Sequence, residues 1–225
     1  MKRTYLYDEH LKLGARFTEF SGWEMPLLYS SIINEHNAVR NAVGVFDASH
    51  MGVFTVSGSS SEEFLNRVCL GNISGLPEKK ARYSMILNEN AGIKDDIIVY
   101  NLGFEYMVVV NAGNLKKDWQ WLNLHKTGKV SLENVSEKLC LFALQGPKAV
   151  EIMQSVSETD VSSIKYFTIS GLKLKNIDAE FAMAARTGYT GEDGFEIFIS
   201  NADGAKFWNE LMKLSVTPCG LGCRD

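Results

Sequence analysis

Strand-like and helix-like segments follow one another in the same order in both halves of this 225-residue chain. In the first half, residues 53–57 alternate like a strand, and a helix, three further strand patterns and a second helix from Asn114 come after them. In the second half, a strand at residues 139–144 precedes a helix that starts at Pro147, three strand patterns and a last helix. The repeated order predicts an α+β fold of duplicated ferredoxin-like units, in which helices cover antiparallel sheets.

Turn-forming residues separate the middle strands of the first half. The segments Asn-Glu-Asn-Ala-Gly at residues 88–92 and Leu-Gly at residues 102–103 lie between strand patterns, which predicts an antiparallel meander. Its strands are expected at residues 82–87, 96–100 and 105–110. The corresponding strands of the second half are expected at residues 164–169, 181–185 and 195–199.

Capping signals mark the start of two helices. A helix is predicted after Ser30 and Ser31, because apolar side chains recur at helical spacing up to Val43, and Gly44 stands where a left-handed residue would end it. The predicted stripe comprises Ile32, Ile33, His36, Val39 and Val43. Ser59 and Ser60 each lie three residues before a glutamate, Glu62 and Glu63 respectively, in the register of a capping box that would start the next helix.

Charge and cysteine content argue against several classes of protein. The net charge is −4 and the pI is near 5.7, so the chain lacks the basic field with which nucleic-acid-binding proteins neutralise phosphates. No apolar run approaches the roughly 18 residues of a membrane-spanning helix. The four scattered cysteines form neither a disulfide scaffold nor a zinc knuckle, and residues 1–13 do not resemble a targeting leader. We therefore expect a cytoplasmic location.

Two adjacent carboxylates, Asp95 and Asp96, directly precede an apolar strand pattern. Because side chains alternate along a strand, Asp96 and Tyr100 would face one way and Asp95 the other, so that one acid looks inward and the other outward. A buried carboxylate in this position would need a functional reason. The residues alone favour the alternative that both acids belong to the turn after Gly92, since aspartate is common in turns.

A glycine-rich segment at residues 186–196 ends on a carboxylate, Glu196, in an apolar strand pattern. Its glycines allow the backbone to approach another group closely, which suits ligand recognition. Glu196 could accept paired N–H bonds from a guanidine-like edge such as that of a pterin ring. The pattern alone favours an ordinary hairpin with an outward-pointing Glu196.

Other candidate residues carry weaker signals. Met25, Met51 and Met85 could line an apolar pocket, although methionine more often fills a core. His50 could titrate near neutrality, but the sequence assigns it no partner acid or nucleophile.

Six short segments, spread over the whole chain, match one protein family when they are taken together. They are Ser-Gly-Trp-Glu-Met-Pro (residues 21–26), Val-Phe-Asp-Ala-Ser-His-Met-Gly (45–52), Gly-Ile-Lys-Asp-Asp (92–96), Val-Asn-Ala (110–112), Leu-Gln-Gly-Pro (144–147) and Arg-Thr-Gly-Tyr-Thr-Gly-Glu-Asp-Gly-Phe-Glu (186–196). The chain thus resembles the glycine cleavage T-protein family, the aminomethyltransferases. This resemblance implies a transfer of the aminomethyl group from the lipoylated H-protein to tetrahydrofolate, which gives 5,10-methylene-tetrahydrofolate and ammonia and requires no metal.

The resemblance also implies roles for particular residues. Asp96 corresponds to the family's catalytic aspartate, and Glu196 corresponds to its folate-contacting glutamate. Arg224, in the segment Gly-Leu-Gly-Cys-Arg-Asp, would also contact folate. Four further side chains would frame the pterin pocket, namely Met51, Tyr83, Tyr100 and Tyr189.

The family pattern divides the chain into three expected parts. Residues 1–52 would pack on the folate-binding core, residues 53–137 would form a first α+β unit with the catalytic hairpin, and residues 138–225 would form a second unit. Family members continue past Asp225 into the rest of the pocket and a separate carboxy-terminal β domain, so the second unit is expected to be incomplete and that domain absent.

Two alternatives stay open. The folate-binding proteins of tRNA modification and iron–sulfur repair carry a cysteine in the glycine-rich signature, whereas Tyr189 and Thr190 stand in that region here with no cysteine nearby. A noncatalytic folate-binding module is the other alternative, and turnover with H-protein would separate it from an enzyme.

Overall fold

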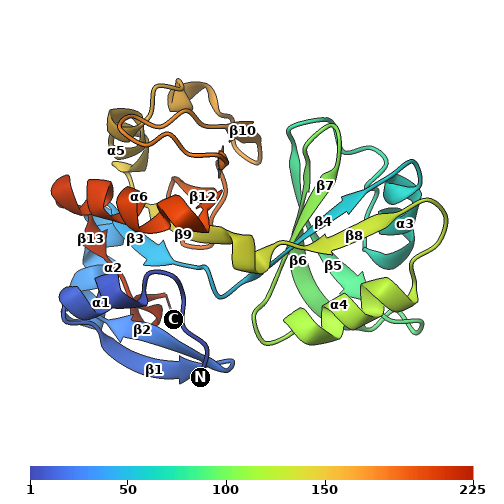
Figure 1. Cartoon of the computed structure of the whole chain (residues 1–225), viewed down its shortest axis with the longest axis horizontal. Coiled ribbons are helices and arrows are strands. Elements are labelled where there is room, and N and C mark those ends of the chain that lie inside the picture. Colours follow the sequence, from blue (N-terminus) through green and yellow to red (C-terminus); the bar gives the residue numbers. More distant parts are fainter. Residues whose placement is uncertain (225) are drawn as a thin grey trace. The chain divides into compact units, whose positions relative to one another are not determined.

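A sheet of five antiparallel strands occupies the middle of the chain in the computed structural model, which describes residues 1–224 (cyan to yellow in Figure 1). This middle unit comprises residues 51–137 and 167–169, and its strands lie in the order β5-β6-β7-β4-β8. Its elements are β4 (Gly52–Ser57), α3 (Ser61–Val68), β5 (Ala81–Leu87), β6 (Ile93–Asn101), β7 (Tyr106–Val110), α4 (Leu115–Leu124) and β8 (Ser131–Asn134). The predicted antiparallel meander is confirmed, since β5 pairs with β6 and β6 with β7.

Helices α3 and α4 cover one face of this sheet. Phe64 of α3 and Leu122 of α4 belong to a single buried cluster with Ile97 and Val99 of β6. Burying an apolar side chain of this size stabilises a fold by about 1.5–3 kcal/mol. Because side chains alternate along β6, the residues that flank Ile97 and Val99 in the strand point to the opposite face, which carries neither helix.

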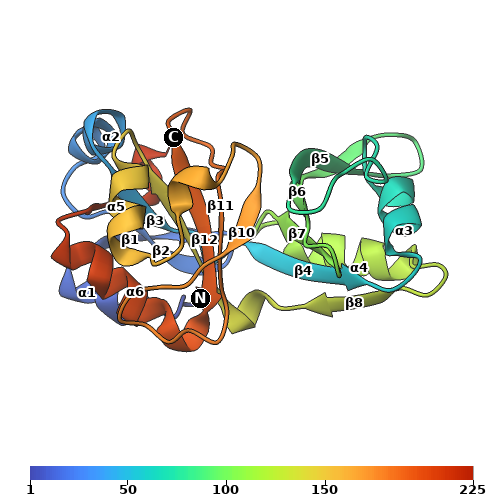
Figure 2. The same cartoon turned by 90° about the horizontal axis from the view of Figure 1, so that it is seen from above.

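The rest of the chain forms a second compact unit. This terminal unit comprises residues 1–50, residues 138–166 and the chain from residue 170 onward. Its six-stranded sheet has the order β10-β11-β12-β9-β3-β13, of which Figure 2 labels β10, β11, β12 and β3. Strands β1 and β2 form a separate hairpin (Figure 1). The elements of the terminal unit are α1 (Tyr7–Lys12), β1 (Arg16–Phe20), β2 (Trp23–Leu28), α2 (Ile32–Asn41), β3 (Gly44–Asp47), η1 (Ser136–Lys138), β9 (Leu139–Gln145), α5 (Ala149–Val156), η2 (Val161–Ser163), β10 (Ile169–Gly171), β11 (Ala182–Ala185), β12 (Gly194–Ser200), α6 (Asn201–Lys213), β13 (Thr217–Pro218) and η3 (Leu221–Cys223).

The core of the terminal unit lies between its sheet and helices α5 and α6. Phe142 of β9 and Ile197 of β12 belong to one cluster with Met153 of α5 and with Phe207 and Trp208 of α6. The strand β3, from the amino-terminal segment, pairs with β9, so residues 1–50 contribute to the same sheet as the carboxy-terminal segment. Among residues 1–224, no helix has the length and apolar character needed to cross a bilayer.

The first capping signal is confirmed, but the predicted apolar stripe is only partly confirmed, since Val39 and Val43 are buried whereas Ile32 is exposed. Ser31 Oγ accepts the N–H of Asn34 at 3.1 Å, as expected for an N-cap. The buried residues of α2 are Glu35 and Val39, whereas Ile33 is 71% exposed. Burial of the Glu35 carboxylate is stabilised by the backbone N–H groups of Tyr29, Ser30 and Gly220, at 2.7, 2.8 and 2.9 Å.

Two other capping expectations are wrong. Gly44 is the first residue of β3 rather than a left-handed cap, and a methyl group there would lie 2.6 Å from Cys219 Sγ. Its hydrogen side chain therefore provides room for packing. Ser60 is the N-cap residue of α3 but caps no N–H of that helix, because its Oγ accepts the N–H of Lys129 at 3.2 Å.

The strand expected at residues 164–169 is largely absent from the described structure. The segment follows the single turn η2, and only Ile169 belongs to a strand, β10. Phe167 has φ of 54°, a left-handed conformation that interrupts an extended strand. Its carbonyl accepts the N–H of Ala81 at 2.9 Å, which fixes the turn.

Candidate functional site

The two adjacent acids of β6 point to opposite faces of the middle sheet. Asp95 is 3% exposed and lies on the same side of the strand as Ile97 and Val99, against α3 and α4. Asp96 is exposed and lies on the face without these helices. The period-two expectation for this pair is therefore confirmed, and the turn alternative is wrong because both residues are inside β6.

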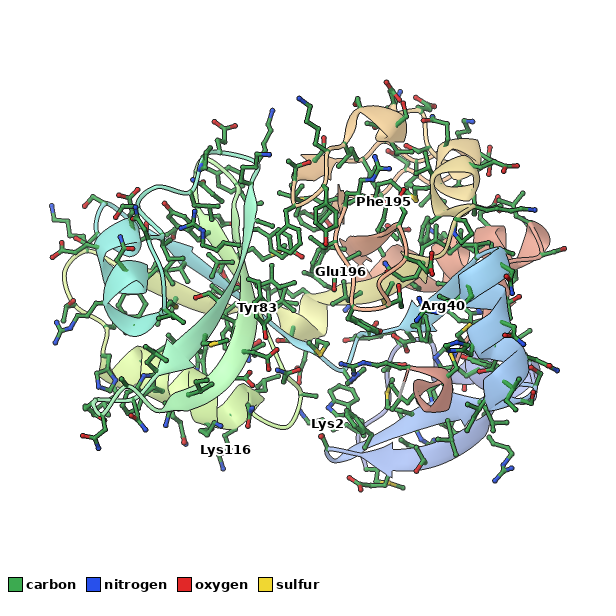
Figure 3. The ribbon with its side chains drawn as sticks, turned by 180° about the vertical axis from the view of Figure 1, so that it is seen from behind. Lys2, Arg40, Tyr83, Lys116, Phe195 and Glu196 are labelled. Carbon is green, nitrogen blue, oxygen red and sulfur yellow. The ribbon has the colours of Figure 1, made fainter. Side chains whose placement is uncertain are left out.

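Two donors hold the exposed carboxylate of Asp96. The Tyr83 hydroxyl, on the neighbouring strand β5, donates to Oδ2 at 3.1 Å. Asn111 Nδ2 donates to Oδ1 at 3.0 Å and to the backbone carbonyl of Asp96 at 3.1 Å. Desolvation and the hydrogen bond to Asp96 raise the pKa of Tyr83, so its phenol stays a donor at neutral pH (Figure 3 labels Tyr83). Asp96 is thus oriented but still accessible.

Asn111 is a site residue that sequence reasoning did not single out. It follows β7 directly, and its side-chain amide reaches both acids: Nδ2 lies 3.0 Å from Asp95 Oδ1 as well as 3.0 Å from Asp96 Oδ1. Its backbone N–H donates to Asp95 Oδ2 at 2.9 Å. The only sequence signal was its place in the short motif at residues 110–112.

The other two expected site residues of the middle unit differ in accessibility. Met51 lies directly before β4 and is partly exposed. Tyr100 lies on β6 four residues after Asp96 and is completely buried. A pocket role for Tyr100 would therefore be one of shaping a wall through packing rather than of offering its hydroxyl.

In the terminal unit, Glu196 lies in a row of four residues across the sheet. The register aligns Phe46 of β3, Ala143 of β9, Glu196 of β12 and Ala185 of β11. Phe46 and Ala143 belong to a small cluster separate from the one beneath α5 and α6, so this row faces away from those helices. Glu196 is 7% exposed, which contradicts the outward-pointing alternative, and the Thr187 hydroxyl donates to its Oε2 (Figure 3).

Tyr189 and Arg224 lie at the same end of this row. The ring centroids of Tyr189 and Phe46 are 6.1 Å apart, in an edge-to-face arrangement. The Arg224 guanidinium carbon is 4.3 Å from the Tyr189 ring centroid, which is the geometry of a cation–π contact. The structure therefore brings together an aromatic ring, a cation and a nearby carboxylate, each from a segment that the sequence had marked separately.

The glycine-rich loop at residues 186–196 folds around the side chain of Gln145. Gln145 is fully buried, its Nε2 donates to the carbonyl of Thr187 at 3.1 Å and its Oε1 accepts the Thr190 hydroxyl at 2.8 Å. A methyl group at Gly188 or Gly194 would collide with this side chain. The close approach that these glycines permit is therefore to Gln145, within the protein.

We expect Gly194→Ala to lower the free energy of unfolding by about 1–3 kcal/mol, the usual cost of overpacking. The added methyl group would collide with the Leu144 carbonyl oxygen, a backbone atom, and would lie 2.5 Å from Gln145 Nε2. Urea unfolding of the chain measures the change. Gly171→Ala is the matched control in the same unit, because nothing lies within 4 Å of its added methyl group. Equal stability of the two variants would contradict this packing.

Two ion pairs fix the ends of this loop. Arg186 Nε and Nη2 donate to the two carboxylate oxygens of Asp193 at 2.9 and 2.6 Å, in the bidentate geometry typical of arginine. Arg40 Nη1, from α2, donates to the Thr190 carbonyl and to Glu192 Oε1, each at 2.8 Å (Figure 3). Tyr189 is thus carried by a loop that is anchored on both sides.

The expectation that His50 titrates near neutrality is wrong. The side chain is 2% exposed, and burial lowers its pKa to about 4, with the Asp47 charge opposing this shift and the Arg224 charge adding to it. No described residue forms a hydrogen bond with either ring nitrogen. His50 is therefore a neutral, packed imidazole whose ring meets Phe20 edge to face, with centroids 5.5 Å apart.

Residues 6–225 match the family model described as the GCVT N-terminal domain. The chain belongs to this family. Together with curated relatives that are named aminomethyltransferase, this match confirms the resemblance to that family.

Relatives of this GCVT N-terminal domain are longer than the chain itself. The protein named aminomethyltransferase from Thermotoga neapolitana is 44% identical over 231 residues, which cover 100% of this chain and 63% of the relative. The aminomethyltransferase of Bacillus cytotoxicus is 44% identical over 233 residues, which cover 100% and 62%. The chain therefore spans less than two thirds of the length of these relatives.

A solved structure confirms the fold of this GCVT N-terminal domain. The crystal structure of the glycine cleavage system aminomethyltransferase T from Bartonella henselae superimposes with a TM-score of 0.92 at 34% identity. It covers 100% of this chain, and the chain covers 61% of it. The predicted α+β fold with antiparallel sheets and covering helices is thus the fold of this family.

Proposed function

We propose that the chain is the folate-binding part of an aminomethyltransferase of the glycine cleavage system. The reaction would take the aminomethyl group from the lipoyl arm of H-protein and leave the carbon on tetrahydrofolate as 5,10-methylene-tetrahydrofolate, with release of ammonia. The observation that supports the proposal is the solvent-accessible carboxylate of Asp96, which accepts hydrogen bonds from Tyr83 and Asn111 and to which the family resemblance assigns the catalytic role. A cytoplasmic location is part of the proposal, and the four free, buried cysteines support it.

The chemistry of the side chains fits a reduced folate. A pterin ring presents adjacent N–H groups, and a carboxylate with few competing solvent contacts, such as Glu196, accepts such donors well. The Tyr189 ring offers an aromatic face, and Arg224 beside it offers donors to carbonyl or carboxylate groups. Within the middle unit, the resemblance to the family assigns folate-contact roles to Asp96, Tyr83, Met51 and Tyr100.

Asp96 would act on protons during the transfer. Tetrahydrofolate supplies two nucleophilic nitrogens, and the aminomethyl carbon becomes bonded to both. Its bonds to the lipoyl sulfur and to its own amino nitrogen break. The two protons lost from the folate nitrogens end on the dihydrolipoyl sulfur and on ammonia, so a group must accept and return them. Asp96 is suited to accept such a proton, because Tyr83 and Asn111 fix the direction of both carboxylate oxygens.

Assaying methylene-tetrahydrofolate formation tests this function. We expect product from aminomethylated H-protein and tetrahydrofolate with a chain extended to the length of its relatives, and a slower rate with the 225-residue chain, which spans 61–63% of those relatives. Calorimetry with tetrahydrofolate accompanies the assay. Binding without turnover in the extended chain would point to a noncatalytic folate module, and the absence of both would contradict the proposal.

A further inference from the structure

Asp118 is a buried acid outside the motifs that the sequence singled out. It lies in the first turn of α4, where its backbone N–H donates to the Asn114 carbonyl at 2.8 Å. Its side chain is 0% exposed, and within residues 1–224 no donor reaches either carboxyl oxygen. A buried carboxylate without a protein donor is strongly destabilised, and a proton on this group removes that cost.

The neighbour of Asp118 is the inward-facing acid of β6. The Asp95 carboxyl group raises the pKa of Asp118, and Asn114 links the two, since its side chain donates to Asp95 and its carbonyl accepts the backbone N–H of Asp118. In contrast to Asp118, Asp95 accepts from the Asn111 backbone N–H at 2.9 Å, from Asn111 Nδ2 at 3.0 Å and from Asn114 Nδ2. Three donors stabilise a negative charge on Asp95, and none stabilises one on Asp118.

The distribution of donors decides where a proton resides. Two adjacent buried carboxyl groups do not both ionise readily, because their charges repel and neither is solvated. Burial, the hydrogen bond to Asp95 and the charge of Asp95 together raise the pKa of Asp118 from 3.8 to about 8, while the charges of Lys117 and Lys94 oppose this rise. Near neutral pH the proton is therefore on Asp118.

We propose that Asp118 is a protonated carboxylic acid that donates to Asp95 and thereby positions Asn111 against Asp96. The inference rests on the proposed function, since Asp96 matters only if the chain transfers aminomethyl groups. Asn111 Nδ2 lies 3.0 Å from Asp95 Oδ1 and 3.0 Å from Asp96 Oδ1. A change of charge on the Asp95–Asp118 pair therefore alters the hydrogen bond between Asn111 and Asp96. A second charge behind Asn111 would draw its amide toward the interior and weaken its hold on Asp96. Asp118 is thus a positioning residue.

The test compares two substitutions of Asp118 in the extended chain. Asp118→Asn keeps a donor for Asp95 but cannot titrate, and Asp118→Leu removes the donor. We expect the parent chain to lose kcat/KM as the pH rises through about 8, where Asp118 deprotonates. The asparagine variant should lack this alkaline loss and keep kcat at neutral pH within about threefold, whereas the leucine variant should lose kcat by roughly tenfold or more. An unchanged alkaline loss in Asp118→Asn would overturn the inference.

A matched control and a spectroscopic measurement separate the inference from the proposed function. Asp203 is also a buried helix aspartate, but Lys206 Nζ donates to it at 2.7 Å, so Asp203→Asn should leave the alkaline loss in place. Infrared spectra of the parent chain near neutral pH should contain a protonated carboxyl band that Asp118→Asn removes. A missing band overturns the inference whatever the activity. A band in a chain without turnover would instead contradict the proposed function.

Discussion

Replacing Asp96 by asparagine should remove most aminomethyl transfer while the chain folds normally. The amide has nearly the shape of the carboxylate but cannot accept a proton, and loss of a positioned general base costs about 10²- to 10⁴-fold in rate. The fold should persist because Asp96 is exposed on the helix-free face of the sheet. The measurement is the rate of methylene-tetrahydrofolate formation by the extended chain, with circular dichroism and thermal unfolding to verify the fold.

Asp95→Asn is the adjacent control for this experiment. The Asp95 carboxylate accepts three N–H donors in the interior, so the NH₂ group of an asparagine there would face other N–H groups. The substitution should therefore lower the free energy of unfolding more than it lowers the transfer rate. A variant that remains folded should retain more activity than Asp96→Asn. If the Asp95 substitution costs as much rate as the Asp96 substitution, Asp96 is not the catalytic acid of the pair.

Glu196→Gln should weaken tetrahydrofolate binding by about 1.5–3 kcal/mol, or roughly 10- to 150-fold in Kd. Glutamine keeps one acceptor but loses the charge and places an NH₂ group where a ligand N–H is expected. The effect should be large because Glu196 is only 7% exposed, so water cannot replace the lost acceptor. Calorimetry with the extended chain measures the affinity.

Glu192→Gln provides the matched control for the binding measurement. Glu192 is in the same loop, but its carboxylate pairs with Arg40 and not with the row of residues that contains Glu196. Because Arg40 keeps its bond to the Thr190 carbonyl and the glutamine oxygen can still accept from it, the loop should stay in place and the control should bind tetrahydrofolate within a few-fold of the parent chain. Unchanged affinity in Glu196→Gln would remove this residue from the ligand contacts.

Most of the fold prediction rested on the alternation of apolar and polar residues along single strands. The meander of the middle unit and the opposite facing of Asp95 and Asp96 follow from a period of two, which is a local property of the sequence. The errors arose where distant residues decide the outcome. Besides the nearby N–H groups of Tyr29 and Ser30, the buried Glu35 accepts that of Gly220, far along the chain, at 2.9 Å. The Phe167 carbonyl accepts the N–H of the distant Ala81. Neither distant partner is visible in a local pattern.

The sequence predicted which residues belong to the candidate site, but it did not predict how they are arranged. Motifs identified Asp96, Glu196, Tyr189 and Arg224, whose roles in folate binding and catalysis stay predictions. The contacts that orient them were not predictable, since Asn111 acts on Asp96 through a tertiary hydrogen bond. A single aspartate on a helix, such as Asp118, carries no signal either, because only the packing of α4 on the sheet buries it.

The terminal unit is built from separate stretches of the chain, and this determines the order in which the two units can fold during synthesis. Strand β3 is made early, but its two partners, β9 and β13, come from residues 139–145 and 217–218, so the sheet of this unit closes only after nearly the whole described chain has been made. The middle unit, by contrast, draws all its strands from residues 52–134. It can therefore fold first on the ribosome. Val45 and Phe46 of β3, which are buried in the folded chain, are not yet covered by their partner strands at that stage. For that interval, we expect the nascent amino terminus to expose apolar side chains of the kind that chaperones bind.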